Sequence, residues 1–195
     1  SKIEIPNTPL NREIFGSEGN QHKRKIARAL LSGIYDVENH FFLDVEIDRV
    51  DSNETRLAKK NIEAIQEIIG KNKKIIIFDR GYPSIEIFNW LEKQGKKFVM
   101  RLSSNDYIKE KEEMTTEDEF IIIRYTYPRL NKIKKTNPEF YEEIKNKIGI
   151  ELRITKIEIN EKTTEYLISN LDKNEFCKDE LKEIYKKRWQ IEISY

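Results

Sequence analysis

Residues 74–84 read Lys-Ile-Ile-Ile-Phe-Asp-Arg-Gly-Tyr-Pro-Ser and combine an apolar run, a turn and the start of a helix. The four apolar residues 75–78 are typical of a strand buried on both faces of a sheet. Gly81 and Pro83 indicate a turn, and Ser84 is a favoured N-cap for a helix that apolar spacing predicts up to Gln94. A buried strand followed directly by a helix favours an α/β fold.

Asp79 is the first polar residue after this strand. Ligands of open α/β sheets bind beyond the carboxyl ends of the strands, so a catalytic carboxylate is expected at this point. Aspartate also stabilises turns by accepting hydrogen bonds from backbone amides. From Asp79 alone, the two interpretations are equally good.

A second cluster of functional groups lies on a helix predicted from about Asp179 to Glu192. At about 100° per residue, Tyr185, Arg188 and Glu192 fall within roughly 60° of one another. Buried charge is costly unless it is paired or binds a metal, so this face is either an exposed edge or a site. An exposed Arg188–Glu192 pair is the simpler interpretation. We expect Trp189 to anchor the same helix in the core.

Composition limits the class of protein. The 195 residues suffice for one domain with a subdomain, and 36% charged and 37% apolar residues are typical of a folded chain. The net charge of +1 predicts that any contact with nucleic acid depends on locally concentrated basic residues. The single cysteine, Cys177, excludes an internal disulfide, and no apolar run approaches the roughly 20 residues of a membrane span. An intracellular protein without a membrane partner is expected.

The order of predicted elements indicates a mixed sheet covered by helices. Beyond residue 103, strands predominate and helical periodicity is nearly absent; residues 138–147 fit either a helical turn or a disordered connection. The predicted strands are 2–5, 29–35, 41–47, 75–78, 97–102, 120–127, 149–160 and 163–171, the helices are 53–69, 84–94 and 179–192, and residues 7–28 form a basic loop.

Three motifs together resemble the DDE transposases of bacterial insertion sequences, in the branch with the Y-R-E-K signature. They are Phe78–Ser84, Leu167–Leu171 and Tyr185-x-x-Arg188-Trp189-x-x-Glu192. The opening adds Ser1-Lys2, Pro6-Asn7, Phe15-Gly16 and Tyr35-Asp36-Val37, so the resemblance spans almost the whole chain.

The resemblance implies an α/β fold of the ribonuclease-H-like kind. This fold has a mixed five-stranded sheet flanked by helices and, in this family, a β-rich insertion before the last catalytic helix. On this chain, residues 1–104 and 173–195 correspond to the catalytic core and residues 105–172 to the insertion.

The resemblance also implies an endonuclease and DNA-joining activity. Such enzymes cleave transposon ends and join the 3′ hydroxyl to target DNA with two Mg²⁺ (or Mn²⁺) ions about 4 Å apart. Asp79 and Glu192 match the second catalytic Asp and the catalytic Glu, which bind metal, and Tyr185 and Arg188 match positions that hold DNA phosphates. Arg80 and Arg101, near strand ends, could also contact phosphate, and for Arg101 an ion pair at the rim is equally good.

The implied partner is double-stranded DNA, both transposon ends and target, bound by a homodimer in the synaptic complex. The implied location is the bacterial cytoplasm, at the nucleoid. Two alternatives remain open at this point: another nuclease of the same fold, and a degenerate or domesticated protein that binds DNA without cutting it.

Two family residues have no match in the chain. The first catalytic Asp falls directly before Ser1, and the signature lysine falls about two helical turns after Glu192, beyond Tyr195. We therefore expect a fragment truncated at both ends, which binds divalent metal weakly and does not cut DNA. Asp36, Asp44 and Asp48 are alternatives for the first catalytic Asp, but they lie on or beyond later strands and do not match the motif.

Overall fold

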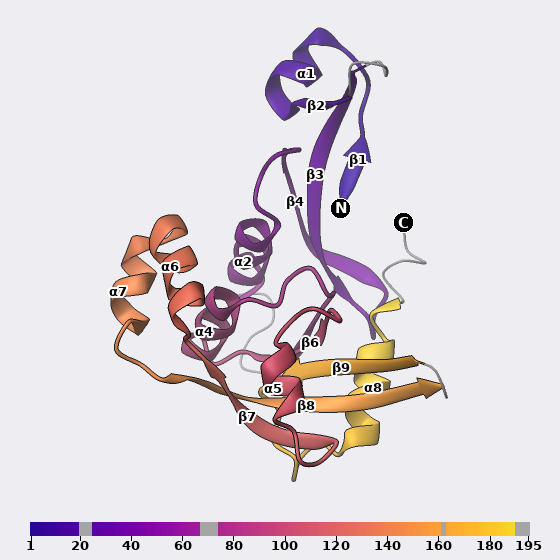
Figure 1. Ribbon diagram of the computed structural model, residues 1–195. Coiled ribbons are helices and arrows are strands. Elements are labelled where there is room, and N and C mark those ends of the chain that lie inside the picture. Colours follow the sequence, from indigo (N-terminus) through magenta and orange to yellow (C-terminus); the bar gives the residue numbers. More distant parts are fainter. Residues whose placement is uncertain (20–24, 67–73, 161–162, 190–195) are drawn as a thin grey trace. The chain divides into compact units, whose positions relative to one another are not determined.

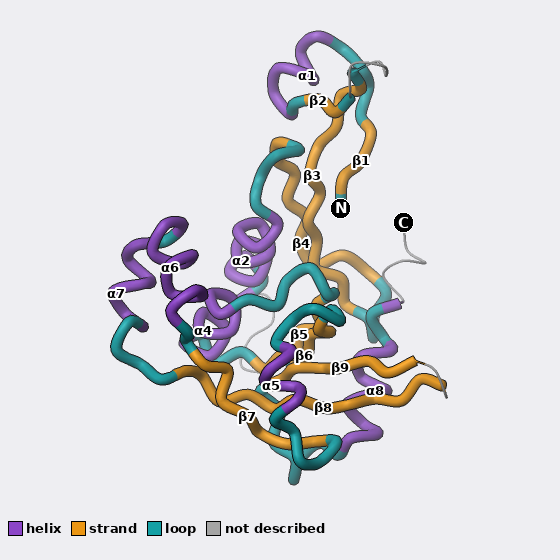
Figure 2. Tube along the Cα trace, viewed as in Figure 1, coloured by secondary structure: helices purple, strands orange, loops and turns teal. Residues whose placement is uncertain are grey.

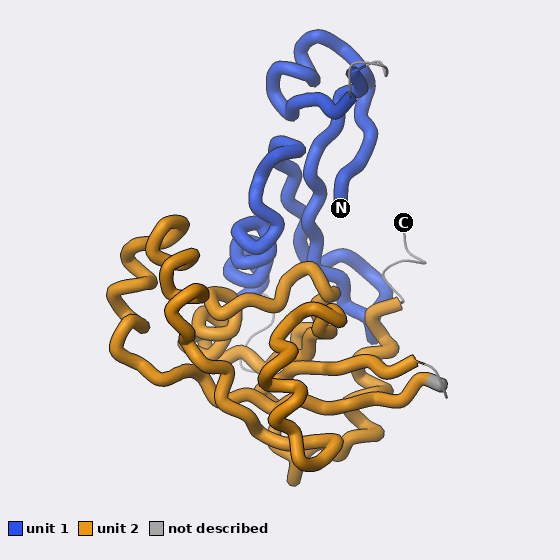
Figure 3. Tube along the Cα trace, viewed as in Figure 1, with its two compact units in different colours: residues 1–72, 190–195 blue, residues 73–189 orange. Residues whose placement is uncertain are grey.

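The computed structural model describes residues 1–19, 25–66, 74–160 and 163–189. The chain divides into two compact units, residues 1–72 with 190–195 and residues 73–189, which Figure 3 distinguishes by colour. Each unit is built around its own sheet, as the secondary structure in Figure 2 shows. No helix in the described ranges has the length and hydropathy that a membrane span requires.

The first unit is organised around one long strand, β3 (Ile26–Asp36). It pairs antiparallel with β1 (Lys2–Glu4), β2 (Ser17–Glu18) and β4 (Phe41–Arg49). The predicted hairpin is confirmed, and both of its strands are longer than predicted. Asp36 accepts hydrogen bonds from the backbone amides of Glu38 and Asn39, each at 3.0 Å, and so fixes the turn between β3 and β4.

Two helices with described bounds accompany this sheet. Helix α2 (Glu54–Ala64) is confirmed as an amphipathic helix, and its buried residues include Leu57 and Ile62. Helix α1 (Pro9–Phe15) lies where the sequence predicted a loop. Thr8 caps α1 by accepting a hydrogen bond from the Asn11 amide at 3.1 Å, and Pro9 occupies the first helical turn.

The second unit contains a five-stranded mixed sheet in the order β5-β6-β9-β8-β7. Strands β5 (Ile75–Phe78) and β6 (Lys97–Leu102) are parallel, and β9 (Thr163–Ser169), β8 (Gly149–Asn160) and β7 (Asp118–Arg124) continue the sheet antiparallel. This is the mixed α/β architecture with flanking helices that was expected, and it is consistent with a ribonuclease-H-like domain. Its composition differs from the expectation, because β3 and β4 pair in the other sheet.

Helices cover both faces of this sheet. Phe88 of α4 (Ile85–Lys93) stacks on Phe98 of β6, with ring centroids 5.9 Å apart. Leu181 of α8 (Lys178–Lys186) belongs to a buried cluster with Val99, the next residue of β6. Successive side chains of a strand point to opposite faces, so α4 and α8 lie on opposite sides of the sheet.

The segment between β6 and β8 is more helical than predicted. It contains α5 (Ile108–Glu112), α6 (Tyr127–Thr136) and α7 (Pro138–Ile144), and α6 packs against α7 as Figure 1 shows. The expectation that strands predominate here is therefore wrong, and of the two alternatives for residues 138–147 the structure has the helix. Strand β7 also ends at Arg124, so Tyr125 and Tyr127 lie outside the strand predicted for residues 120–127.

Candidate functional site

Asp79 follows the last residue of β5, at the carboxyl end of the strand. The Tyr82 amide donates a hydrogen bond to the Asp79 carbonyl at 3.3 Å, which closes the predicted turn. Ser84 caps α4 by accepting from the Ile87 amide at 3.3 Å. The strand, the turn and the helix leave the Asp79 side chain 48% exposed at the rim of the sheet.

Tyr185 and Arg188 come from α8 and the turn that follows it. Leu181 and Tyr185 are buried against the sheet, and Arg188 continues the helix through a hydrogen bond from its amide to the Tyr185 carbonyl at 3.1 Å. The Arg188 side chain is 9% exposed, and its Nε lies 3.8 Å from Asp79 Oδ1. The structure therefore brings the two parts of the predicted site together as an ion pair between the helix and the strand end.

A second ion pair lies on the same face of the sheet. Arg101 Nη1 is 2.5 Å from Glu165 Oε1, and both side chains are mostly buried. Arg101 is opposite Leu167 in the β6–β9 register, so Glu165, two residues before Leu167, shares its face. Arg101 thus takes the rim pairing that the sequence left open, while its phosphate contact stays a prediction.

The phenol of Tyr185 lies in the field of these four charges. Burial raises the pKa of Tyr185 to about 12; Asp79 and Glu165 act in the same direction, and Arg188 and Arg101 oppose them. Its hydroxyl is buried and has no hydrogen-bond partner among the described residues. Tyr185 is therefore a neutral hydroxyl with its donor unused.

Two further predicted residues are placed differently. Arg80 is exposed in the turn after Asp79. Trp189 is 53% exposed and lies under the Arg188 guanidinium, with 4.5 Å from Cζ to the ring centroid. The expectation of a core anchor at Trp189 is wrong, because the ring covers a cation instead of entering the apolar cluster.

Of the two predicted metal ligands, the described residues include Asp79. Glu192 lies outside the described residues. Among the residues that are described, no group of three His, Cys, Asp or Glu side chains could hold a metal ion. Asp79 alone offers a half-exposed carboxylate, and carboxylate oxygen is the donor that hard divalent cations prefer. The chemistry of Asp79 therefore fits a metal ligand, within a set that the described residues do not complete.

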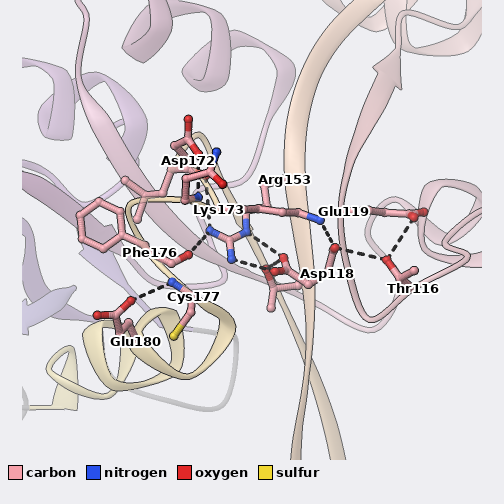
Figure 4. Close-up of polar contacts among 12 residues, drawn as sticks. Thr116, Asp118, Glu119, Arg153, Asp172, Lys173, Phe176, Cys177 and Glu180 are labelled. Atoms are coloured by element: carbon pink, nitrogen blue, oxygen red, sulfur yellow. Dashed lines mark hydrogen bonds and ion pairs between the residues drawn. The ribbon is translucent and has the colours of Figure 1, made fainter.

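A buried ionic network fixes the segment that leads into α8 (Figure 4). Arg153 of β8 is fully buried and donates to both carboxylate oxygens of Asp118, Nε to Oδ1 at 2.7 Å and Nη2 to Oδ2 at 2.8 Å. Its Nη1 donates to the carbonyls of Phe176 at 2.8 Å and Leu171 at 3.4 Å. These two carbonyls belong to the connection between β9 and α8, so Arg153 holds the approach to the helix that carries Tyr185.

The network also sets the charge state of Asp118. Burial acts to raise the pKa of this carboxyl, but hydrogen bonds from Arg153 and from Thr155 Oγ1, at 2.8 Å, outweigh it, and the pKa is lowered. Asp118 is therefore a stable anion. Neither residue was singled out from the sequence: Arg153 is one charged residue in an alternating strand, and Asp118 lies before the strand predicted for residues 120–127.

Glu165 is the other residue of this region that sequence reasoning missed. A signal was present in the predicted strand 163–171. Glu165 lies two and four residues before Leu167 and Ser169, so it shares their face of the strand, which should be buried. A carboxylate in that position indicates a buried partner, and Arg101 is that partner.

The chain matches the family described as Transposase DDE domain over residues 3–195. Because the match covers nearly the whole sequence, the chain belongs to the transposase DDE domain family. A transposase catalytic domain, acting on DNA, is thus the class that the family defines, and enzymes of this class generally use divalent metals. Comparison with curated proteins gives no match.

Proposed function

We propose that the chain is the catalytic domain of a DNA transposase of a bacterial insertion sequence, in the branch with the Y-R-E-K signature. In this proposal the enzyme cleaves transposon ends and joins the freed 3′ hydroxyl to target DNA. The observation that carries the proposal is the approach of Arg188 to Asp79 at 3.8 Å, beside the buried Tyr185 hydroxyl. Residues from distant motifs of the family pattern thereby meet at the carboxyl end of β5.

Asp79 and Glu192 are the proposed catalytic carboxylates and ligands of Mg²⁺ or Mn²⁺. When bound, two such ions stabilise the attacking and leaving oxygens of an in-line phosphoryl transfer. Asp79 suits this role because its carboxylate is half exposed at a strand end. The 195 residues match two of the three family carboxylates. We therefore expect a polypeptide of these residues to bind divalent metal weakly and not to cleave DNA.

The proposed phosphate contacts come from Tyr185, Arg188, Arg80 and Arg101. Tyr185 holds its proton throughout the neutral range, since its pKa is about 12, and can only donate or accept a hydrogen bond there. Arg188 is largely buried beside Asp79, and a guanidinium in that position can hold phosphate oxygens in bidentate geometry. Arg101 would have to share its guanidinium with Glu165, whereas Arg80 is already exposed.

The wider setting of the reaction follows from the same proposal. Two copies would pair two transposon ends in a synaptic homodimer. The reaction would take place at the nucleoid in the bacterial cytoplasm. The alternatives, a nuclease without strand transfer and a DNA-binding protein without cleavage, differ from it in what happens to the DNA ends.

The experiment that tests the function is the substitution Asp79→Ala in the protein made from the complete gene. We expect excision of the element from a donor plasmid to be lost by a factor of at least about 10³, because transition-state charge is no longer stabilised, while end binding in a gel shift is retained. Asp51→Ala is the matched control, since the Asp51 side chain is 70% exposed and pairs with Arg49 in the first unit.

Three outcomes distinguish the transposase from the nuclease and from the DNA-binding protein. Excision that survives Asp79→Ala contradicts the proposed role of this carboxylate. Cleaved but unjoined ends with the unmodified protein favour the nuclease. Binding without cleavage by every variant favours the degenerate DNA-binding protein.

A further inference from the structure

Helix α6, like α1, buries none of its residues, and α6 is the more basic of the two. It follows the edge strand β7 and contacts α7, the next helix in the chain. Its side chains include Arg129, Lys132, Lys134 and Lys135 and no carboxylate. Tyr127 at its start is 78% exposed. Burial stabilises such an exposed and cationic helix little. A functional role would explain the charge on its surface.

Three lysines define one surface of α6, which we name the α6 lysine face: Lys132, Lys134 and Lys135. All three are exposed, whereas Leu130 and Ile133 are half buried. At about 100° per residue the three lysines spread over roughly 160° of the helix, on the side away from the two apolar residues. The face is therefore directed to solvent and continuous along the helix.

The α6 lysine face has no counter-ions in the described part of the chain. None of its lysines forms an ion pair there, although Lys134 Nζ lies 5.4 Å from the centroid of the Tyr141 ring. By contrast, neighbouring Arg129 donates to Glu110 at 3.1 Å, and Lys145 of the following turn pairs with Glu142. From Phe120 to Pro138 the sequence contains no Asp or Glu.

This local excess of charge is notable because the whole chain is nearly neutral, with 36 basic and 35 acidic residues. Like charges three or four residues apart on a helix, such as Lys132 and Lys135, repel and destabilise it by a few tenths of a kcal/mol per pair. A polyanion that lies along the face would remove this repulsion. Lysines act as point charges and suit backbone phosphates, which carry no base-specific pattern.

An anionic membrane is a weaker match for the same charge. Basic helices that lie on membranes also insert a broad apolar face among the lipids. On α6 the aliphatic residues Leu130 and Ile133 are half buried, and Tyr127 is the large apolar residue that stands exposed. Helix α6 therefore has the positive charge that an anionic membrane would attract, but its described residues form no broad exposed apolar face that could insert among the lipids.

We propose that the α6 lysine face binds the phosphate backbone of duplex DNA away from the reacting phosphate. This inference rests on the proposed function for its DNA substrate. Strand β7 runs antiparallel to β8, β8 to β9 and β9 to β6, which is parallel to β5. The carboxyl ends of β7 and β5 therefore lie at opposite ends, as well as opposite edges, of the sheet.

The separation of the two surfaces follows from sheet geometry. Four strand spacings of about 4.8 Å put the edge strands β7 and β5 roughly 19 Å apart. At about 3.4 Å per base pair, a straight duplex that crosses from one edge to the other spans about six base pairs. The α6 lysine face would thus hold a flanking segment of the DNA and help to set its direction across the sheet.

The test compares two triple variants of this 195-residue chain with the same change of net charge. Lys132→Gln/Lys134→Gln/Lys135→Gln removes the α6 lysine face. The control, Lys2→Gln/Lys60→Gln/Lys145→Gln, removes three exposed lysines that are paired with Glu18, Glu46 and Glu142. The probe is a fluorescently labelled DNA duplex of random sequence, and its dissociation constant is measured by anisotropy over a series of salt concentrations.

We expect the α6 variant to lose at least about tenfold in affinity at low salt. The slope of log K against log salt should fall by about 2.7, since each lost phosphate contact contributes about 0.9. The control should bind within about threefold of the unmodified chain, since a surface ion pair adds little to the local potential. Thermal unfolding checks that both variants remain folded.

The outcomes of this binding experiment can be told apart from a failure of the proposed transposase function. If the unmodified chain binds the duplex and the α6 variant binds equally well, the role of α6 is wrong while the Asp79→Ala experiment still decides the function. If both triple variants lose affinity equally, net charge and not the α6 lysine face is responsible, and the inference is again wrong. Binding of the unmodified chain to phosphatidylserine vesicles but not to the duplex would overturn it in favour of a membrane surface.

Discussion

At the scale of single residues, the Tyr185 hydroxyl is the most informative group. It is buried and lacks a hydrogen-bond partner among the described residues, whereas most buried hydroxyls are satisfied. A buried hydroxyl without a partner gives no stability in return for its desolvation. A ligand that completes the hydrogen bond therefore explains this hydroxyl better than packing does.

Substituting Tyr185→Phe should leave the free energy of unfolding within about 1 kcal/mol of the unmodified value, because no hydrogen bond is lost. Tyr125→Phe is the matched comparison, since the buried Tyr125 hydroxyl donates to Asn89 Oδ1 at 2.9 Å and accepts from Asn89 Nδ2 at 2.7 Å. It should cost about 1–3 kcal/mol. Urea denaturation measures both, and equal losses would mean that Tyr185 has a partner.

The sequence predicted part of this residue-level picture. Asp79 was recognisable as the first polar residue after an apolar strand, and Tyr185 and Arg188 as polar groups on an otherwise apolar helix face. What could not be predicted was the pairing. Arg188 was expected to pair with Glu192 or with phosphate, but its approach to Asp79 depends on where α8 packs on the sheet.

At the scale of elements, the packing of α8 depends on the Arg153 network. A fully buried arginine is tolerated because Asp118 and two backbone carbonyls receive its donors. The same interactions tie strand β7, strand β8 and the connection into α8 to one point. The location of the helix that carries Tyr185 thus depends on a residue of β8, a strand that contributes nothing to the candidate site.

Arg153→Met should destabilise the chain by about 3–5 kcal/mol, because it leaves the partly buried Asp118 carboxylate without its main partner. Arg124→Met provides the control: Arg124 Nη1 donates to both carboxylate oxygens of Glu113, but the Arg124 side chain is 50% exposed. That substitution should cost less than about 1 kcal/mol. Urea denaturation of the two variants measures the difference, and similar losses would show that the buried network does not anchor α8.

Three helices share a start signal: α1 and α6, which the sequence did not predict, and α7, which it left open as a helical turn. Helices α1, α6 and α7 begin at Thr8-Pro9, Thr126-Tyr127-Pro128 and Asn137-Pro138, each an N-cap residue followed by a proline in the first turn. Asn137 accepts from the Phe140 amide at 3.2 Å. Helices α1 and α6 bury no residue, so their sequences have only a weak apolar periodicity. A prediction based on apolar periodicity therefore overlooks them. Local capping chemistry would have found them.

At the scale of the whole molecule, carboxylates dominate the dependence of stability on pH. All described carboxyls with a resolved shift have a lowered pKa: Glu18, Asp48, Glu110, Glu117, Asp118, Glu119 and Glu180. Hydrogen bonds to the carboxylate are the largest cause in five of them. At Glu110 and Asp118 burial is the largest influence and acts the other way, but hydrogen bonds from Arg129 and Arg153 outweigh it.

The sign of the effect follows from proton uptake. Below the ordinary values of 3.8 for Asp and 4.5 for Glu, the unfolded chain binds protons that the folded chain does not. Stability is therefore fully present above about pH 4.5 and is lost as the pH falls through the lowered values. Urea denaturation from neutral pH downward should show this loss. Asp118→Asn should reduce the slope, and stability that rises on acidification would contradict the assignment.

The sheet topology itself lay beyond sequence reasoning. Each strand of the five-stranded sheet was recognisable from its own residues, but the order β5-β6-β9-β8-β7 depends on pairing between segments far apart in the chain. The division into a core of residues 1–104 and 173–195 and an insertion of residues 105–172 stays a prediction. Strands β7, β8 and β9 of that predicted insertion nevertheless share a sheet with β5 and β6.

The place of β9 in this order has a consequence for synthesis on the ribosome. Strands β5 and β6 can pair early, and β7 can pair with β8 later, but β9 alone joins the two halves. Until residues 163–169 emerge, β6 and β8 each present an open edge, and such edges promote association with other chains. The nascent chain therefore passes through a vulnerable interval that ends when β9 closes the sheet, shortly before the residues of α8 appear.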